Sequence, residues 1–226
     1  QPNYSPATKP NSISLKSAKN EFIGFLLCAR SQGGPLAGFT PSISGTLVSS
    51  APASATFYKL FHHTVSERGN AYEKPGEWPD AAVPYKDVFY GETRDGSEAG
   101  WGQTVPENRT VVFFVEIFVP SSTIAGVTYT ASVSLSTNAG SLVSSTPVSV
   151  YVWNFAIPDQ WSLGNVWGFY GQYNNLDPTA FGSRNDSLAR EYLFNLQKSA
   201  SNHGLWLYTD GSSRGTTGPS PTGDFK

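Results

Sequence analysis

Residues 127–136 read VTYTASVSLS, an unbroken alternation of apolar and hydroxylic side chains. Successive side chains of a β-strand point to opposite faces, so this period of two predicts a strand with one buried face and one solvated face. The same alternation returns at Val148, Val150 and Val152 after a serine-rich connection. Two such strands in succession indicate an antiparallel sheet that covers a core with one of its faces.

Further strands are expected on the N-terminal side of this pair, separated by turns rich in glycine, proline and serine. Residues 111–119 are more continuously apolar, which is typical of a central strand. No long helical pattern interrupts the series before residue 158. The pattern therefore predicts a mainly β fold, an antiparallel β-sandwich, whose other strands are residues 21–30, 42–48 and 55–65.

The connection between the strands near residues 65 and 111 is unusually long. It spans residues 66–107 and is rich in glycine and proline. A loop of this length without regular structure is uncommon in a compact domain and is often functional. We expect its aromatic residues to fold down onto the sandwich; they are Trp78, Tyr85, Phe89, Tyr90 and Trp101.

The pattern changes after residue 158. Residues 166–170 read as a short strand, residues 188–203 place apolar side chains at helical spacing, and residues 205–208 read as a second strand. One strand–helix–strand unit of a parallel α/β barrel leaves its sheet edges uncovered, so we expect an incomplete barrel-like segment here. The predicted organisation is an N-terminal arm (1–11), a β-sandwich domain (12–157), a partial (β/α) barrel segment (158–210) and a flexible tail rich in Ser, Gly and Pro (211–226).

Charge and composition exclude several classes of function. Charged residues make up 14% of the chain and its net charge is −2, so no basic stripe exists to neutralise nucleic-acid phosphates or an anionic membrane surface. No apolar run approaches the ~18 residues of a membrane-spanning helix. Cys28 is the single cysteine, so an intrachain disulfide is impossible, and its place in an apolar run predicts a buried thiol.

A secreted protein is the expected class. The chain contains no methionine, which a removed signal peptide or an internal fragment would explain, and its first residues are polar and rich in proline. Three triplets match the N-glycosylation pattern, at Asn3, Asn108 and Asn185. We expect an extracellular or cell-surface location, in which these asparagines are candidate glycosylation sites.

Five short segments carry more than a secondary-structure pattern. They are SAKNEF (17–22), GEWPDAAVP (76–84), VEIFVP with AG (115–120 and 125–126), VWNFAIP (152–158) and REY (190–192). Together and in this order they resemble a family of bacterial glycoside-hydrolase-like proteins. The resemblance implies an N-terminal β-sandwich followed by a (β/α)8 barrel, which is catalogued as a domain of unknown function. Ala82-Val83 departs from the family, which has a large aliphatic pair there.

No catalytic residue is assigned from the sequence. Glycoside hydrolysis generally needs two carboxyl groups, and in the barrel that the resemblance implies they lie on later strands. Candidate carbohydrate contacts are aromatic rings that can stack on sugars and an aspartate at a strand end; core burial and turn formation are the alternatives. The candidate carbohydrate contacts are Trp78, Trp101, Trp167, Tyr170, Tyr173 and Asp210.

No metal site is expected at the adjacent histidines His62 and His63, because they point to opposite faces of a strand. No cofactor is expected either.

Three functions remain open. The first is the N-terminal β-sandwich portion of a secreted glycoside-hydrolase-like protein, supporting a carbohydrate-active barrel that this chain does not complete, so that the chain alone is not catalytic. The second is an extracellular structural subunit that assembles into a fibre or surface layer through its N-terminal arm and exposed sheet edges. The third is a carbohydrate-binding module that uses the 66–107 connection. The expected partners are a carbohydrate or glycan, copies of the chain itself, or a chain that supplies the rest of the barrel.

Overall fold

A computed structural model describes residues 12–31, 33–67, 74–94, 100–159, 167–169, 187–205 and 207–209. The chain divides into two compact units, residues 1–158 and residues 159–226. The first unit contains the β-rich part of the chain, and the second contains helix α3 (Ser187–Asn202). The predicted arm (1–11) and tail (211–226) lie outside the described residues.

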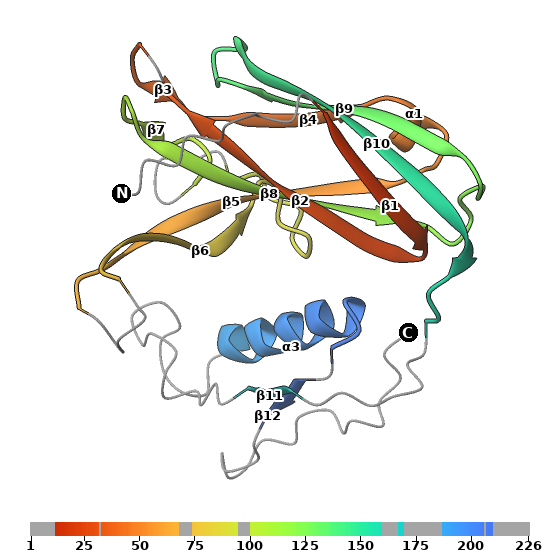
Figure 1. Ribbon diagram of the computed structural model, residues 1–226. Coiled ribbons are helices and arrows are strands. Elements are labelled where there is room, and N and C mark those ends of the chain that lie inside the picture. Colours follow the sequence, from red (N-terminus) through yellow and green to blue (C-terminus); the bar gives the residue numbers. More distant parts are fainter. Residues whose placement is uncertain are drawn as a thin grey trace. The chain divides into compact units, whose positions relative to one another are not determined.

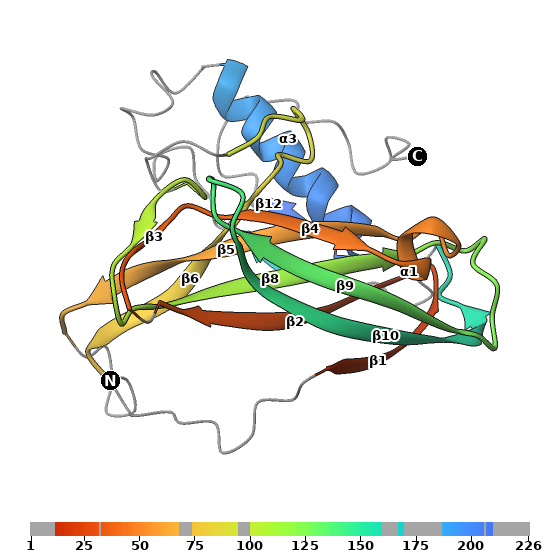
Figure 2. The same cartoon turned by 90° about the horizontal axis from the view of Figure 1, so that it is seen from above.

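Two four-stranded sheets build the first unit (Figure 1, Figure 2). We name them the hydroxyl sheet and the aromatic sheet after the side chains on their outer faces. The hydroxyl sheet has the order β1 (Ile13–Lys19), β10 (Leu142–Ala156), β9 (Thr128–Ser136) and β4 (Thr40–Ser44). The aromatic sheet has the order β2 (Glu21–Arg30), β8 (Thr110–Val119), β5 (Ser54–Val65) and β6 (Gly76–Pro84). A short helix, α1 (Thr46–Ser49), and a two-stranded pair, β3 (Leu36–Ala37) with β7 (Thr104–Val105), complete the unit.

The inner faces of both sheets share one hydrophobic core. Along β8 and β9 every second residue is buried, and for β9 the alternation in the sequence predicts this pattern. Trp101, Phe39 and Phe113 are the largest of the fully buried side chains. Lys59 is buried as well, and its Nζ donates a hydrogen bond to the Gly100 carbonyl oxygen at 3.0 Å. The predicted mainly β class is therefore confirmed, and two packed sheets provide it.

The structure corrects several local expectations. The expected strand 42–48 is wrong in part: β4 ends at Ser44, and Gly45, with φ 116°, turns the chain into α1. The 66–107 connection is not a structureless loop, because it contains β6 and β7. Cys28 is exposed rather than buried, because it lies on the outer face of β2. The sheets are also not purely antiparallel, since β1 pairs in parallel with β10.

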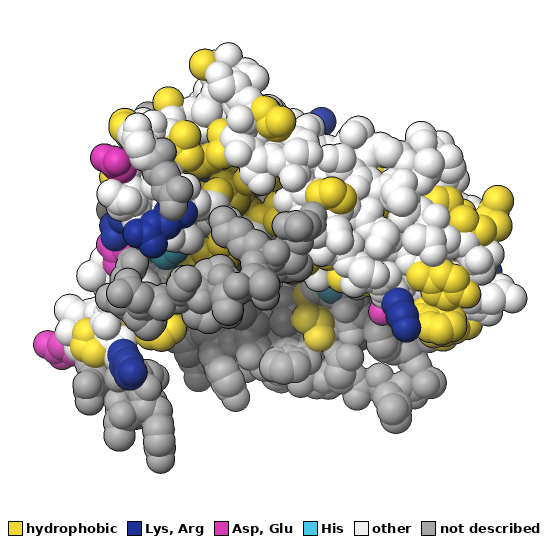
Figure 3. All heavy atoms as spheres, turned by 45° about the horizontal axis from the view of Figure 1, so that its top comes forward, with side chains coloured by type: hydrophobic (Ala, Val, Ile, Leu, Met, Phe, Trp, Pro, Cys, Tyr) yellow, Lys and Arg dark blue, Asp and Glu magenta, His cyan; other side chains and the backbone are white. Residues whose placement is uncertain are grey.

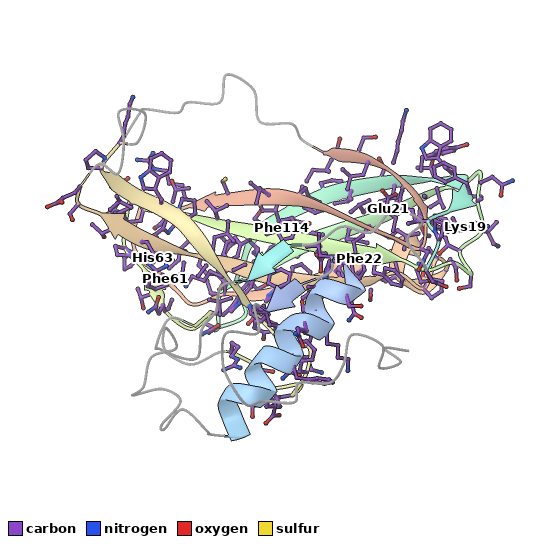
Figure 4. The ribbon with its side chains drawn as sticks, turned by 90° about the horizontal axis from the view of Figure 1, so that it is seen from below. Lys19, Glu21, Phe22, Phe61, His63 and Phe114 are labelled. Atoms are coloured by element: carbon purple, nitrogen blue, oxygen red, sulfur yellow. The ribbon has the colours of Figure 1, made fainter. Side chains whose placement is uncertain are left out.

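The turn between β1 and β2 carries the chain from the hydroxyl sheet into the aromatic sheet. Asn20 adopts a left-handed φ of 59°, and its Nδ2 donates a hydrogen bond to the Ile157 carbonyl oxygen at 2.8 Å. The Ile157 N–H donates in turn to the Lys19 carbonyl oxygen at 2.9 Å. The segments SAKNEF and VWNFAIP therefore meet at one end of the unit, where Figure 4 labels Lys19 and Glu21.

The two outer faces differ in chemistry. On the hydroxyl sheet, the Ser132 and Ser145 hydroxyls of β9 and β10 lie 2.8 Å apart. Figure 3 brings this side forward and shows few charged side chains on it. On the aromatic sheet, the rings of Phe22 and Phe118 lie 4.7 Å apart across β2 and β8. This outer apolar layer explains why residues 111–119 read as a continuous apolar run rather than as an alternation.

The described part of the second unit holds three elements in the predicted order of strand, helix and strand. β11 (Trp167–Phe169) pairs in parallel with β12 (Leu207–Thr209), and α3 lies between them in the sequence. Three elements do not establish a barrel, so the barrel-like segment stays a prediction. Among the described residues, no helix is both long and apolar enough to cross a membrane.

Candidate functional site

Trp78 lies on β6, which pairs with β5. Of the two candidate tryptophans whose side chains the structure describes, it is the more exposed. The strand register places Trp78 directly opposite His63, and the Trp78 side chain is 50% exposed. Its Nε1 donates a hydrogen bond to the Lys74 carbonyl oxygen at 2.9 Å, which orients the indole ring. Phe61 packs edge-on against His63, with the ring centroids 5.2 Å apart (Figure 4). Cross-strand partners share a face, so Phe61, His63 and Trp78 form one aromatic surface, which we call the ribbon surface.

The opposite face of these paired strands carries an ion pair. Arg109 donates hydrogen bonds to both carboxylate oxygens of Glu77, with 2.6 Å between Nη2 and Oε1. This bidentate bond holds the pKa of Glu77 below its usual value. Burial lowers the pKa of the nearby His62 imidazole. The strand register places His62 and His63 on opposite faces, as the sequence predicts. Within the described part of the chain, no group of three or more His, Cys, Asp or Glu side chains can hold a metal ion.

Trp101, the second tryptophan of the 66–107 connection, does not reach the surface. Its side chain is 0% exposed, and its ring lies 5.1 Å from Phe113 and 5.2 Å from Tyr85. The indole Nε1 donates a hydrogen bond to the Val83 carbonyl oxygen at 3.0 Å, so the polar atom is satisfied within the core. The prediction that Trp101 contacts carbohydrate is therefore wrong for this conformation, because no sugar can reach its ring.

A compact hairpin over residues 85–94 follows the end of β6, and the Asp87 carboxylate organises its tip. Oδ1 accepts hydrogen bonds from the N–H groups of Phe89 and Tyr90, both at 2.9 Å. Oδ2 accepts a hydrogen bond from the Arg94 guanidinium at 2.9 Å. Bonds from one carboxylate to successive backbone N–H groups fix the path of a turn. The side chains at the tip therefore stand on a defined backbone rather than on a loose loop.

The tip itself presents apolar side chains to solvent. Val88 is 59% exposed, Phe89 is 36% exposed and Tyr90 is 54% exposed. The expectation that the aromatic residues of the 66–107 connection fold onto the sandwich is therefore only partly right, because about half of the Tyr90 side chain, like that of Trp78, stays exposed. The sequence contains a signal for this: Asp87 and Gly91, which has φ 72°, bracket the three residues as turn-forming positions.

The hairpin should loosen in acid. Partial burial raises the pKa of Asp87, but the bonds from the Tyr90 N–H, Arg94 and the Phe89 N–H outweigh it and hold this pKa below the usual 3.8. A carboxyl with a lower pKa in the folded state stabilises the fold above pH 3.8, and this contribution is lost as the pH falls through the folded value. Amide hydrogen exchange at Phe89 and Tyr90, corrected for intrinsic rates, should therefore accelerate as the pH falls below 3.8. In Asp87→Asn the exchange should lose this pH dependence, and an unchanged dependence in the variant would contradict the assigned role.

Most of the remaining candidates lie outside the described residues. Trp167 belongs to β11, but its side chain is not among those described. Asn108 is exposed in a turn, where its φ is 63° and its N–H donates to the Ser31 carbonyl oxygen at 3.1 Å. The candidates outside the described residues are Tyr170, Tyr173, Asp210, Asn3 and Asn185.

Comparisons with known proteins give a similarity of fold. No family model matches the chain, and no curated protein matches its sequence. Among solved structures, the chain is similar to a family 123 glycoside hydrolase from Clostridium perfringens, described for glycolipid glycan hydrolysis, with a TM-score of 0.59 and 14% identity. The match covers 88% of this chain and 33% of that enzyme, so this chain spans about a third of the enzyme's length. A second similarity, to a PapD-like domain of human CEP192, has a TM-score of 0.27 and 12% identity over 68% of this chain and 94% of that domain, and supports no conclusion. The chain thus shares its fold with part of a glycoside hydrolase, which supports the glycoside-hydrolase-like resemblance at the level of fold.

Proposed function

We propose that this chain is the N-terminal β-sandwich portion of a secreted glycoside-hydrolase-like protein and supports a carbohydrate-active barrel that it does not itself complete. The observation that carries the proposal is the fold similarity to a glycoside hydrolase over 88% of this chain and only 33% of the enzyme. The resembling segments SAKNEF and VWNFAIP also support it, because they come from opposite ends of the first unit and hydrogen bonds join them.

The architecture of the first unit suits a supporting role. Its hydrophobic core lies between two four-stranded sheets, and two of its acidic side chains make structural bonds. Glu77 pairs with Arg109 and Asp87 holds a turn, so neither is a spare carboxyl group poised as an acid or base. A glycosidase needs a pair of such groups flanking the scissile bond. The proposal accordingly assigns catalysis to the barrel, where the resemblance places the carboxyl pair on later strands.

The proposal predicts where activity resides. The gene should encode further strand–helix repeats after the codon for Lys226, and the full polypeptide should hydrolyse at least one member of a panel of aryl glycosides. The isolated 226-residue chain, at equal concentration, should show no turnover above buffer. Sequencing of the gene and intact-mass measurement of the native protein provide the first test, and chromogenic assays provide the second. Hydrolysis by the isolated chain, or a native protein that ends at Lys226, would overturn the proposal.

A further inference from the structure

A hollow of about 650 Å³ lies on the first unit beside the 85–94 hairpin. One wall comes from Pro41 on β4, a second from residues 55–57 on β5, and the third from residues 85–91 of the hairpin. A volume of a few hundred to about a thousand Å³ is the range of small-molecule sites. The hollow is thus large enough for a ligand of one to a few rings.

Strand pairing explains why the hollow exists. β6 ends at Pro84, opposite Tyr58 on β5, so the preceding residues of β5 extend beyond the end of that pairing. The chain then leaves the sheet, and the Tyr85 N–H donates a hydrogen bond to the Phe57 carbonyl oxygen at 2.8 Å. β4 belongs to the other sheet, so the hollow opens at the edge between the two sheets. Its floor is the rigid core, because Phe57 is buried and Tyr85 packs on Trp101.

The lining combines aromatic rings with polar groups. Phe57, Tyr85, Phe89 and Tyr90 contribute rings, and Lys86 contributes an ammonium group. The Asp87 carboxylate also lines the hollow, but it is neutralised by its ion pair with Arg94. Aromatic faces pack on the apolar faces of pyranose rings, and ammonium and carboxylate groups bond their hydroxyls. The combination of aromatic rings with one ammonium donor therefore matches a saccharide.

We propose that this hollow is a saccharide-binding site in which the Tyr90 ring stacks on a sugar ring while the Lys86 ammonium donates hydrogen bonds to its hydroxyls. The choice of a saccharide rests on the proposed function, whereas the location rests on the lining alone. Tyr90 is the ring suited to stacking, because it is 54% exposed and stands on the backbone that Asp87 fixes. The site lies on the sandwich and would hold a glycan without cleaving it.

Calorimetric titration of the 226-residue chain with cellohexaose, xylohexaose and chitohexaose tests the site. At least one of these probes should bind, and Tyr90→Ala should weaken its binding about tenfold, the scale expected for one lost ring contact. Tyr90→Phe should retain most of the affinity, because the ring is kept. The matched control is Trp78→Ala, which removes an equally exposed ring from the ribbon surface and should leave binding unchanged.

Two outcomes would overturn this site. Loss of binding in Trp78→Ala but not in Tyr90→Ala would assign the glycan to the ribbon surface. Absence of binding to all three probes by the wild-type chain, with its circular dichroism spectrum intact, would remove the hollow as a saccharide site. Neither outcome affects the proposed function, which is decided by the coding sequence after the Lys226 codon and by hydrolysis in the full polypeptide.

Discussion

Replacing Trp101 with alanine should lower the free energy of unfolding by about 3–5 kcal/mol, the usual cost of deleting a large aromatic side chain from a core. The Trp101 side chain is fully buried, and it contacts the rings of Phe113 and Tyr85. The substitution leaves a cavity between them and also leaves the Val83 carbonyl oxygen without its indole donor. Because domains are stable by only about 5–15 kcal/mol, this loss should be visible as a large drop in the guanidinium midpoint measured by circular dichroism.

Trp78→Ala is the matched control for this measurement. Both substitutions remove a tryptophan from the same connection, but the Trp78 side chain is half exposed. Surface substitutions of this kind change the free energy of unfolding by less than about 1 kcal/mol. Equal destabilisation by the two variants would show that Trp101 is not a core residue.

Gly45→Ala should destabilise the first unit by about 2–6 kcal/mol, combining roughly 1–3 kcal/mol of backbone strain with roughly 1–3 kcal/mol of overpacking. Gly45 has φ 116° and ψ −175°, a region that glycine alone occupies readily. A Cβ atom there would lie 2.5 Å from the Thr130 carbonyl oxygen and 2.9 Å from the Ala131 Cα. Both contacts are backbone atoms of β9, so no side chain can rotate away to relieve them. Thermal unfolding followed by circular dichroism would report the loss.

Gly126→Ala separates strain from the clash. Gly126 also has a positive φ, 76°, but a Cβ atom added there meets nothing within 4 Å. Its substitution should therefore cost only the backbone term, about 1–2 kcal/mol. If Gly126→Ala proved as costly as Gly45→Ala, close approach to β9 would not be the reason for glycine at position 45.

The candidate site shows where reasoning from sequence stops. Trp78 and Trp101 lie in the same connection, each close to a glycine and a charged residue, so their local patterns do not separate a surface ring from a core ring. The register of β5 with β6 places one beside His63, whereas long-range packing encloses the other against Phe113. The hollow is less predictable still, because its walls come from β4, β5 and a hairpin that are distant in the sequence.

The alternation in residues 127–136 and at Val148, Val150 and Val152 was sufficient to establish the β class, because the two faces of a strand impose a local period that the residues themselves display. Similarly, the turn-forming Asp87 and Gly91 mark the hairpin locally. The pairing of strands, by contrast, is not displayed by any local pattern. The assignment of strands to two sheets decides the parallel pairing of β1 with β10, the burial of Trp101 and the exposure of Cys28. Those features depend on contacts between residues up to more than a hundred positions apart, such as Asn20 with Ile157, and only the folded chain brings such residues together.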